Sequence, residues 1–239
     1  MCGRNWRPKR MDNAPLLPSH GGYRKLKSFQ VAQLAYDVTV QFCNQYINPR
    51  SRTHDQMVQA ARSGVQNIAE GSRASGTSKK MELKLTNVAR ASLDELCLDY
   101  EDYLRQHSLS QWPRHDPRRE ELVAHRPRSL NEVLQWAAWV QDKSCGPGGE
   151  DKGSGPGGPG RPGGQEENHN DSGAPSTRST RSTKTPSPDE TLANGALALI
   201  NVASTLLGRQ IEAQAAAFER DGGFTERLYA TRQARRHAP

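Results

Sequence analysis

The chain has 239 residues, of which 33% are hydrophobic and 6% aromatic, and its formal net charge is +7. This composition excludes two large hydrophobic cores and favours one modest domain accompanied by segments that do not fold. The four cysteines are too scattered for a disulfide framework, and no apolar run approaches the roughly 18–20 residues that cross a bilayer. We therefore expect a cytoplasmic protein with reduced thiols and no membrane partner.

The positive charge is concentrated near the N-terminus. Residues 1–28 contain seven Lys or Arg against one Asp, whereas residues 29–106 contain nine of each sign. Residues 1–22 also hold three prolines and a Gly-Gly pair, which oppose helix formation. We expect residues 1–22 to form a flexible basic arm and the folded domain to be nearly neutral.

A first long helix is predicted for residues 23–47. Apolar side chains recur there at three- and four-residue steps, which places them on one face. The stripe is wide enough for a bundle, and it consists of Phe29, Ala32, Tyr36, Val40, Cys43 and Ile47. Asn48-Pro49 ends this helix, and the capping-box spacing of Thr53 and Gln56 starts the next.

Residues 56–104 indicate two helices that fold back on each other. The first carries an apolar stripe up to Ala69. Gly71 is expected to end it, because a glycine just past the last periodic residue can adopt the left-handed conformation. We expect Asn67 and Glu70 to satisfy backbone groups at the bend.

The second of these helices takes its cap from the hydroxyl groups of residues 72–78 and carries an apolar stripe from Leu85 to Tyr100. Small residues lie on the stripes of both helices, where they would let the two backbones approach closely. They are Ala61, Gly64, Ala89 and Ser92.

One set of residues in this hairpin has a familiar pattern, namely Gln56, Ala60, Arg62, Ser63, the run Asn67-Ile68-Ala69-Glu70-Gly71, Ala89, Ser92-Leu93 and Glu95-Leu96. It resembles the four-helix-bundle family known from intervening sequences of bacterial 23S ribosomal RNA, which includes the accessory variability protein of diversity-generating retroelements. The segments 20–24 and 221–227 resemble a longer subgroup called four helix bundle suffix proteins. We take Asn67, Glu70, Gly71 and Ser92 as the structural motif of this resemblance.

The resemblance covers residues 20–106 and 189–230 and implies an up-and-down four-helix bundle. Members associated with retroelements are ring-forming pentamers that bind nucleic acid and a reverse transcriptase. The resemblance therefore implies a homo-oligomer, with five subunits as the model, and a reverse transcriptase or another protein as partner.

Residues 107–143 read as a loop followed by a short helix that contains two tryptophans. Prolines and charges dominate up to Pro127, with one helical turn expected at residues 120–124. A capping box then opens a helix over residues 130–141, which includes Trp136 and Trp139. This helix either caps one end of the bundle or exposes a tryptophan platform to a partner.

Residues 144–188 are rich in Gly, Ser, Thr and Pro and are predicted to be a disordered linker. Residues 189–221 form the fourth helix, which Gly222-Gly223 terminates, and residues 222–239 form a basic tail. The predicted fold is all-α, an up-and-down four-helix bundle with a long disordered insertion between helices three and four.

The sequence contains no recognisable catalytic or cofactor-binding motif. None of the seven histidines pairs with Glu or Cys at a metal-ligand spacing such as that of di-iron bundles. The nearest approach is Glu121 to His125, in a loop bounded by prolines. We expect neither an enzyme nor a metal or other cofactor.

The topology brings basic residues to one end of the bundle. If the four helices alternate, the start of helix one, the bend after helix two and the end of helix four share one pole. The candidate nucleic-acid-binding residues there are Arg24, Lys25, Lys27, Arg73, Lys79 and Lys80, joined by Arg232, Arg235 and Arg236 of the tail. The opposite pole receives Asp99, Glu101 and Asp102.

Two functions fit these features. The first is a non-enzymatic, oligomeric accessory protein that binds nucleic acid non-specifically through the basic pole, since no segment offers a base-reading surface. The second is a protein-interaction or self-assembly module without nucleic-acid binding. Self-association is expected because several aromatic side chains widen the apolar faces beyond one bundle interior. These are Tyr36, Phe42, Tyr100 and Tyr103.

Overall fold

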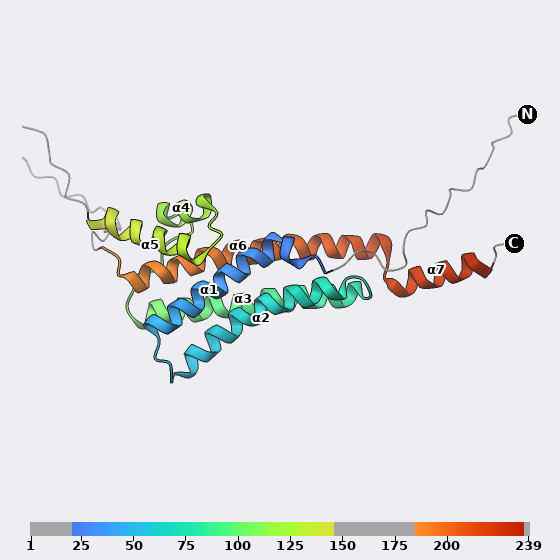
Figure 1. Cartoon of the computed structure of the whole chain (residues 1–239), viewed down its shortest axis with the longest axis horizontal. Helices are drawn as coiled ribbons and strands as arrows, with labels where there is room; N and C mark the ends of the chain where they lie inside the picture. Colours follow the sequence, from blue (N-terminus) through green and yellow to red (C-terminus); the bar gives the residue numbers. More distant parts are fainter. Residues whose placement is uncertain (1–20, 146–184, 237–239) are drawn as a thin grey trace, which may run out of the picture.

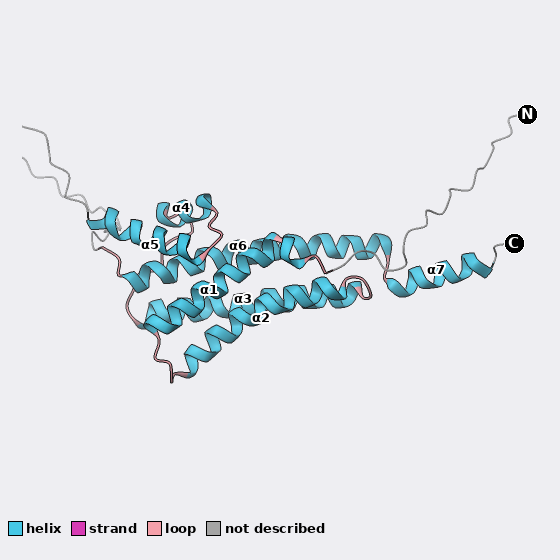
Figure 2. Ribbon diagram, in the orientation of Figure 1, coloured by secondary structure: helices cyan, strands magenta, loops and turns pink. Residues whose placement is uncertain are grey.

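The computed structural model describes residues 21–145 and 185–236, and every regular element in these two ranges is helical (Figure 2). The elements are η1 (Tyr23–Lys25), α1 (Lys27–Tyr46), α2 (Arg52–Ala74), α3 (Lys79–Gln106), α4 (Pro117–His125), α5 (Leu130–Cys145), α6 (Pro188–Asp221) and α7 (Phe224–Arg236). The predicted all-α class is confirmed. Most of the predicted 144–188 linker and residues 1–20 of the predicted arm lie outside the described residues.

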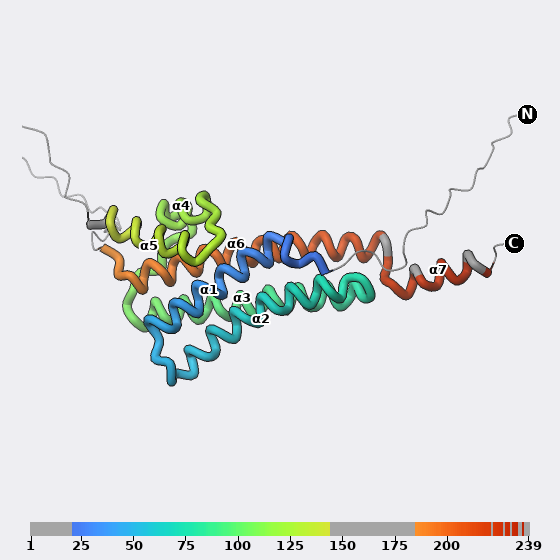
Figure 3. Tube along the Cα trace, in the orientation of Figure 1, coloured from blue at the N-terminus to red at the C-terminus, as the bar shows by residue number. Residues whose placement is uncertain are grey.

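Four long helices form the bundle. Helices α1, α2, α3 and α6 run alternately in opposite directions along the long axis of the molecule (Figures 1 and 3). Each packs on two of the others, in the closed order α1, α2, α3, α6 and back to α1. This arrangement confirms the up-and-down four-helix bundle.

Aromatic side chains fill the interior of this bundle near the ends of α1 and α3. The ring of Phe42 lies 5.0 Å from that of Tyr100 and 4.8 Å from that of Tyr103, measured between centroids. All three are buried, and the Tyr100 hydroxyl donates a hydrogen bond to Thr39 Oγ1 at 3.1 Å. The expectation that these aromatics are surplus to one interior was therefore wrong, and Tyr36 is itself half-buried against the core. The apolar surface of these aromatic side chains is therefore covered mainly by other residues of the same chain.

The first helix begins later than predicted. Residues Tyr23–Lys25 form a single 3-10 turn, and Leu26 is extended with ψ 128° before α1 starts. The turn is anchored by Tyr23, which is buried edge-on against Phe29 at 4.9 Å between centroids. Residues 21–26 therefore cross the end of α2 instead of continuing the axis of α1.

Helix α2 extends beyond both predicted ends. Its N-cap is Ser51, whose Oγ accepts a hydrogen bond from Thr53 N, so Thr53 is not the cap. Gly71 lies inside the helix and does not end it, which corrects the prediction. A Cβ at Gly71 would lie 3.2 Å from Glu82 O and 3.3 Å from Leu85 Cβ. This glycine is required for the close approach of α3, not for a left-handed turn.

The small-residue contact between α2 and α3 is present as predicted. A Cβ at Gly64 would lie 2.8 Å from Leu93 Cδ2, and Ala61 and Ala89 are fully buried. Ser63 Oγ and Ser92 Oγ lie 3.0 Å apart, which joins the two helices by a polar contact.

Two residues of the hairpin motif differ from expectation. Asn67 Nδ2 donates to Ser63 O at 2.9 Å and to Ser63 Oγ at 3.1 Å, so it satisfies a carbonyl within α2 and not at the bend. Glu70 is exposed and makes none of the hydrogen bonds found between described residues. The bend is instead closed by Ser78, whose Oγ accepts from Met81 N and caps α3.

The pair α4 and α5 covers the first half of α6 (Figure 1). Trp136 on α5 is 6% exposed, and a Cβ at Gly195 of α6 would lie 2.6 Å from its Cζ3 atom. Trp112, in the loop before α4, is 2% exposed and donates from Nε1 to Glu190 at 2.9 Å. With Trp139 also half-buried, the tryptophan helix lies along the side of α6 near one end of the bundle and does not form an exposed platform.

Helix α6 is the most deeply enclosed element. Residues 191–200 are all buried, because α1, α3, α4 and α5 surround this half of the helix. By length and composition alone Pro188–Glu226 could cross a membrane, contrary to the expectation that no run is apolar enough. However, 67% of its most apolar window is buried inside the bundle, which is typical of a core helix.

Helix α6 ends at the predicted Gly222, which has φ 64° and whose backbone N–H bonds Phe218 O at 2.9 Å. Helix α7 follows and points away from the bundle (Figure 1). The predicted basic tail is thus largely a helix.

Candidate nucleic-acid interface

The basic end of the molecule is formed by η1, the end of α2, the start of α3 and the second half of α6 (Figure 1). Gly21 N donates to Ser72 O at 3.1 Å, which ties the chain before η1 to the end of α2. The alternating topology therefore brings the predicted residues of η1, α2 and α3 to one end.

Five of the six predicted cations are exposed, namely Arg24, Lys25, Lys27, Arg73 and Lys80. Two of them are held by Tyr23. The guanidinium carbons of Arg73 and Arg24 lie 5.1 and 5.2 Å from its ring centroid, and Arg73 Nη2 donates to its hydroxyl at 3.2 Å. The buried tyrosine thus fixes the position of Arg73, while the guanidinium charge of Arg73 stays in contact with solvent.

Lys79 differs from the other five. Its Nζ lies 3.0 Å from Glu82 Oε2, and its side chain is half-buried. Lys79 therefore offers less free charge to a ligand than the other five, because Glu82 neutralises much of its charge. Glu70, exposed on the last turns of α2, adds a further negative charge to this end.

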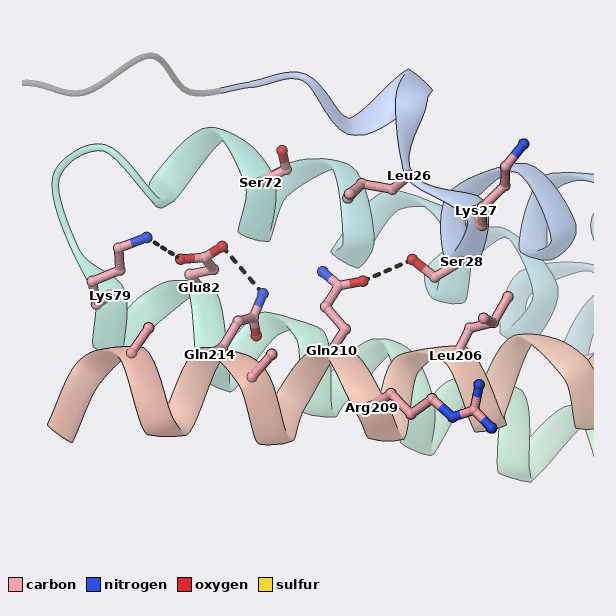
Figure 4. Close-up of a pocket in the computed structure, with 12 residues that line it drawn as sticks. Leu26, Lys27, Ser28, Ser72, Lys79, Glu82, Leu206, Arg209, Gln210 and Gln214 are labelled. Atoms are coloured by element: carbon pink, nitrogen blue, oxygen red, sulfur yellow. Dashed lines mark hydrogen bonds and ion pairs between the residues drawn. The ribbon is translucent and has the colours of Figure 1, made fainter. Parts of the chain in front are cut away.

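An open groove of about 510 Å³ lies between the start of α1, the start of α3 and the second half of α6 (Figure 4). Ser28 Oγ donates to Gln210 at 2.7 Å on one side of it. Gln214 Nε2 donates to Glu82 Oε1 at 3.1 Å on the other side, and Gln214 Oε1 is buried without a hydrogen-bond partner among the described residues. The groove is thus a mostly apolar depression with a few polar contacts, and Lys27, Lys79 and Arg209 are among the residues that line it.

Arg209 lines this groove and was not among the predicted residues (Figure 4). It is exposed and lies one residue before Gln210, which contacts the start of α1. The only sequence signal for it was its place on the polar side of the fourth helix. That signal does not tell which neighbouring helix the residue approaches.

A second groove, of about 450 Å³, lies between α2 and α3. Its charged lining consists of Arg52, Asp55 and Glu95, so acids outnumber cations there. A polyphosphate strand is not attracted to such a lining. The basic end is the better candidate.

The tail adds charge beyond the bundle. Arg232 and Arg236 of α7 are exposed, whereas the side chain of Arg235 lies outside the described part of the structure. Helix α7 projects from the basic end (Figure 1). The positive region is therefore longer than the bundle pole alone.

Acidic side chains gather at the opposite end of α3, as predicted. Asp99 is half-buried there, and its pKa is raised above its ordinary value, first by burial and then by the charges of Glu95 and Asp102. Asp102 also accepts from Arg105 Nη2 at 2.8 Å. Helix α3 therefore carries cations near its start and acids near its end.

The described thiols are poor nucleophiles. Burial, followed by the charge of Asp99, raises the pKa of Cys43 to about 12. Burial and neighbouring acids raise that of Cys97 to about 11. Both thiols are therefore protonated at neutral pH. Within residues 21–145 and 185–236 no three His, Cys, Asp or Glu side chains gather as metal ligands would.

Comparison with protein-family models found no match, and comparisons with curated proteins and with solved structures found none either.

Proposed function

We propose that this chain is a non-enzymatic, oligomeric accessory protein that binds nucleic acid non-specifically through its basic end. The observation that supports this most is the gathering of exposed cations from three separate segments, represented by Arg24, Arg73 and Lys80. Such cations release counterions when they contact phosphates, and this drives binding without regard to sequence.

The surroundings of Tyr23 favour phosphate contacts over base contacts. Its ring is buried and faced by two arginines, so it offers no surface on which a base could stack. Tyr23 is also the sole aromatic residue of η1 and of the ends of α2 and α3 at this pole, and Phe218 in the second half of α6 is half-buried. We therefore propose that RNA and DNA are bound alike through their backbones. By the resemblance above, a reverse transcriptase is the proposed protein partner.

The test is binding of labelled single- and double-stranded oligonucleotides, measured by fluorescence anisotropy over a range of salt concentrations. The key variant carries Arg24→Ala, Lys25→Ala and Lys80→Ala, which remove three exposed cations that form no ion pair with another described residue. Three lost phosphate contacts should reduce the slope of log affinity against log salt by about 2–3.

A matched control removes three exposed cations elsewhere, with Arg50→Ala, Arg52→Ala and Arg62→Ala. It changes the net charge equally but leaves the basic end intact, so its salt slope should stay close to that of the wild type. Equal losses in both variants would contradict a defined interface. Absence of any binding by the wild type at low salt would favour the alternative, a self-assembly module without nucleic acid.

That alternative has one specific observation in its favour. Large apolar side chains are exposed on the outer side of α3 and on α7, where no other described element covers them: Met81, Val88, Leu98 and Tyr229. Uncovered apolar residues on helices are typical of protein contacts.

A further inference from the structure

Helix α7 makes no extensive contact with the other helices in the described part of the chain. It projects from the end of α6, away from the bundle helices (Figure 1). Tyr229 is 66% exposed, and Arg232 and Arg236 are exposed three and seven residues after it. Residues at this spacing share one helical face. Helix α7 thus presents an aromatic side chain followed by two cations. The acid on this face, Glu226, lies before Tyr229 and accepts a hydrogen bond from Gly223 N at 2.9 Å.

The outer face of α3 has the complementary character. Leu98 is 63% exposed, the most exposed of the large aliphatic side chains in the described residues. Its neighbours on the helix surface are the residues three and four positions away on either side. All four are acidic: Asp94, Glu95, Glu101 and Asp102.

The acids of this face repel one another. Burial, followed by the charges of Glu95 and Asp102, raises the pKa of the neighbouring Asp99. Gln111 donates to Glu101 at 2.9 Å and Arg105 contacts Asp102, whereas Arg90 contacts Asp94 only at 3.9 Å. An approaching basic helix would relieve the remaining repulsion, so the face favours a cationic partner.

The α7 helix of the same copy cannot reach this face. Helix α6 passes the start of α3 near Gln214, which lines the same groove as Lys79, and α7 begins beyond that point. A helix rises about 1.5 Å per residue, so Leu98 lies about 28 Å from Lys79 at the start of α3. Tyr229 lies only about 8 Å from the start of α7, which is too short to span that distance. The complementary surfaces can meet only between two copies.

We propose that α7 of one copy docks on the outer face of α3 of a second copy, with Tyr229 against Leu98 and the two arginines among the surrounding acids. Because the surfaces differ, the contact is head-to-tail and repeats into a ring or a chain. This inference rests on the proposed self-association and names the surfaces responsible. A single-helix contact is small, so the association is concentration-dependent and weakens with salt.

The experiment is sedimentation velocity of the full-length protein over a wide concentration range at low and at moderate salt. Two charge-reversal variants are compared with the wild type, Arg232→Glu with Arg236→Glu, and Glu95→Arg with Asp102→Arg. All four side chains are exposed, so circular dichroism should show unchanged folding. Each variant alone should lose self-association by about tenfold or more in apparent Kd.

Mixing the two variants provides the decisive step. The α7 variant then offers an acidic α7 to the basic α3 surface of the α3 variant. The α3 variant in turn offers its unchanged basic α7 to the unchanged acidic α3 surface of the α7 variant. Association should return in the mixture although neither variant associates alone. A further pair, Leu98→Ala and the control Met81→Ala on the same helix, separates the docking face from the rest of α3, and only the former should weaken association.

Three negative outcomes of these experiments would contradict different parts of the proposal. If the wild type associates and the reversals leave it unchanged, the α7 contact is wrong while self-association stands. If the mixture fails to restore association, the pairing of these two surfaces is wrong. A wild-type monomer at all concentrations overturns both this contact and the proposed oligomer, and the anisotropy measurement then judges nucleic-acid binding separately.

Discussion

Arg73 donates a hydrogen bond from Nη2 to the hydroxyl of Tyr23 at 3.2 Å, which links the end of α2 to η1. Arg24 faces the same ring at nearly the same distance but makes no such bond in the described structure. The two arginines therefore have similar charge and ring contacts but different structural roles.

We expect Arg73→Ala to lower the free energy of unfolding by about 1 kcal/mol, the usual contribution of one hydrogen bond. Arg24→Ala is the matched control and should cost only a few tenths of a kcal/mol, because its contact with the ring is exposed. Urea denaturation of both variants measures the difference. Equal costs would show that the bond to Tyr23 contributes nothing.

The contact between Gly195 and Trp136 predicts that Gly195→Ala destabilises the protein. The added Cβ would lie 2.6 Å from the indole ring, which packing on α6 holds in place. Overpacking of this kind costs about 1–3 kcal/mol.

Gly208 in the same helix provides the control, since the nearest atom to an added Cβ there is Arg90 Nη1 at 3.7 Å. Gly208→Ala should stabilise the helix by up to about 1 kcal/mol. Thermal melts followed by circular dichroism should therefore shift in opposite directions, and a shared direction would contradict the tight contact at Trp136.

The hydrogen bonds of Asn194 predict that truncating its side chain lowers the free energy of unfolding by a large amount. Its Oδ1 accepts from Trp112 N at 2.8 Å, and its Nδ2 donates to Ser110 O and Glu190 O. Asn194→Ala would leave the buried Trp112 N–H without this partner, so we expect a cost of about 2–3 kcal/mol. The readout is the urea midpoint together with tryptophan fluorescence. A cost below that of Arg73→Ala would show that this loop is not anchored through Asn194.

The raised pKa of Cys43 predicts a loss of stability in alkali. The pKa of this thiol in the folded protein, about 12, lies above its ordinary value of 9.0 because the thiol is buried. The unfolded chain therefore loses this proton first, and stability falls as pH rises above about 9. Between pH 8 and 10 we expect about 1 kcal/mol of loss from this thiol.

The variant Cys43→Ala tests this assignment. It lacks that titration, so its stability should fall less between pH 8 and 10 than that of the wild type, whatever its stability at neutral pH. Urea midpoints at three pH values suffice. Parallel curves for the two proteins would contradict the role of Cys43.

The helices were predictable because their signals are local. Periodic apolar residues placed the four long helices, and glycine at Gly222 ended α6 as expected. The same rule failed at Gly71, where contact with the backbone of α3 decides the role of the glycine. A rule based on neighbours in sequence cannot distinguish a terminating glycine from one that allows close packing.

The candidate site was predictable only in outline. Topology alone brought Arg24, Arg73 and Lys80 to one end, since alternating helices share their poles. Arg209 was not predicted, because the register of α6 against α1 is set by contacts such as that of Ser28 with Gln210, which are 182 residues apart in sequence. The pairing of Lys79 with Glu82, in contrast, joins residues three positions apart in α3, so the spacing in the sequence already indicates it.

The enclosure of α6 has a consequence for how the protein is made. On the ribosome, α1, α2 and α3 emerge well before Thr191 to Ile200, the buried half of the helix that completes their core. Until then the nascent chain exposes apolar faces that cannot close on themselves, a state prone to aggregation and recognised by chaperones. Closure must also join segments as distant as Ser28 and Gln210, which slows folding relative to a bundle with short connections. The domain can therefore complete its fold only after α6, the last long helix to be synthesised, is available.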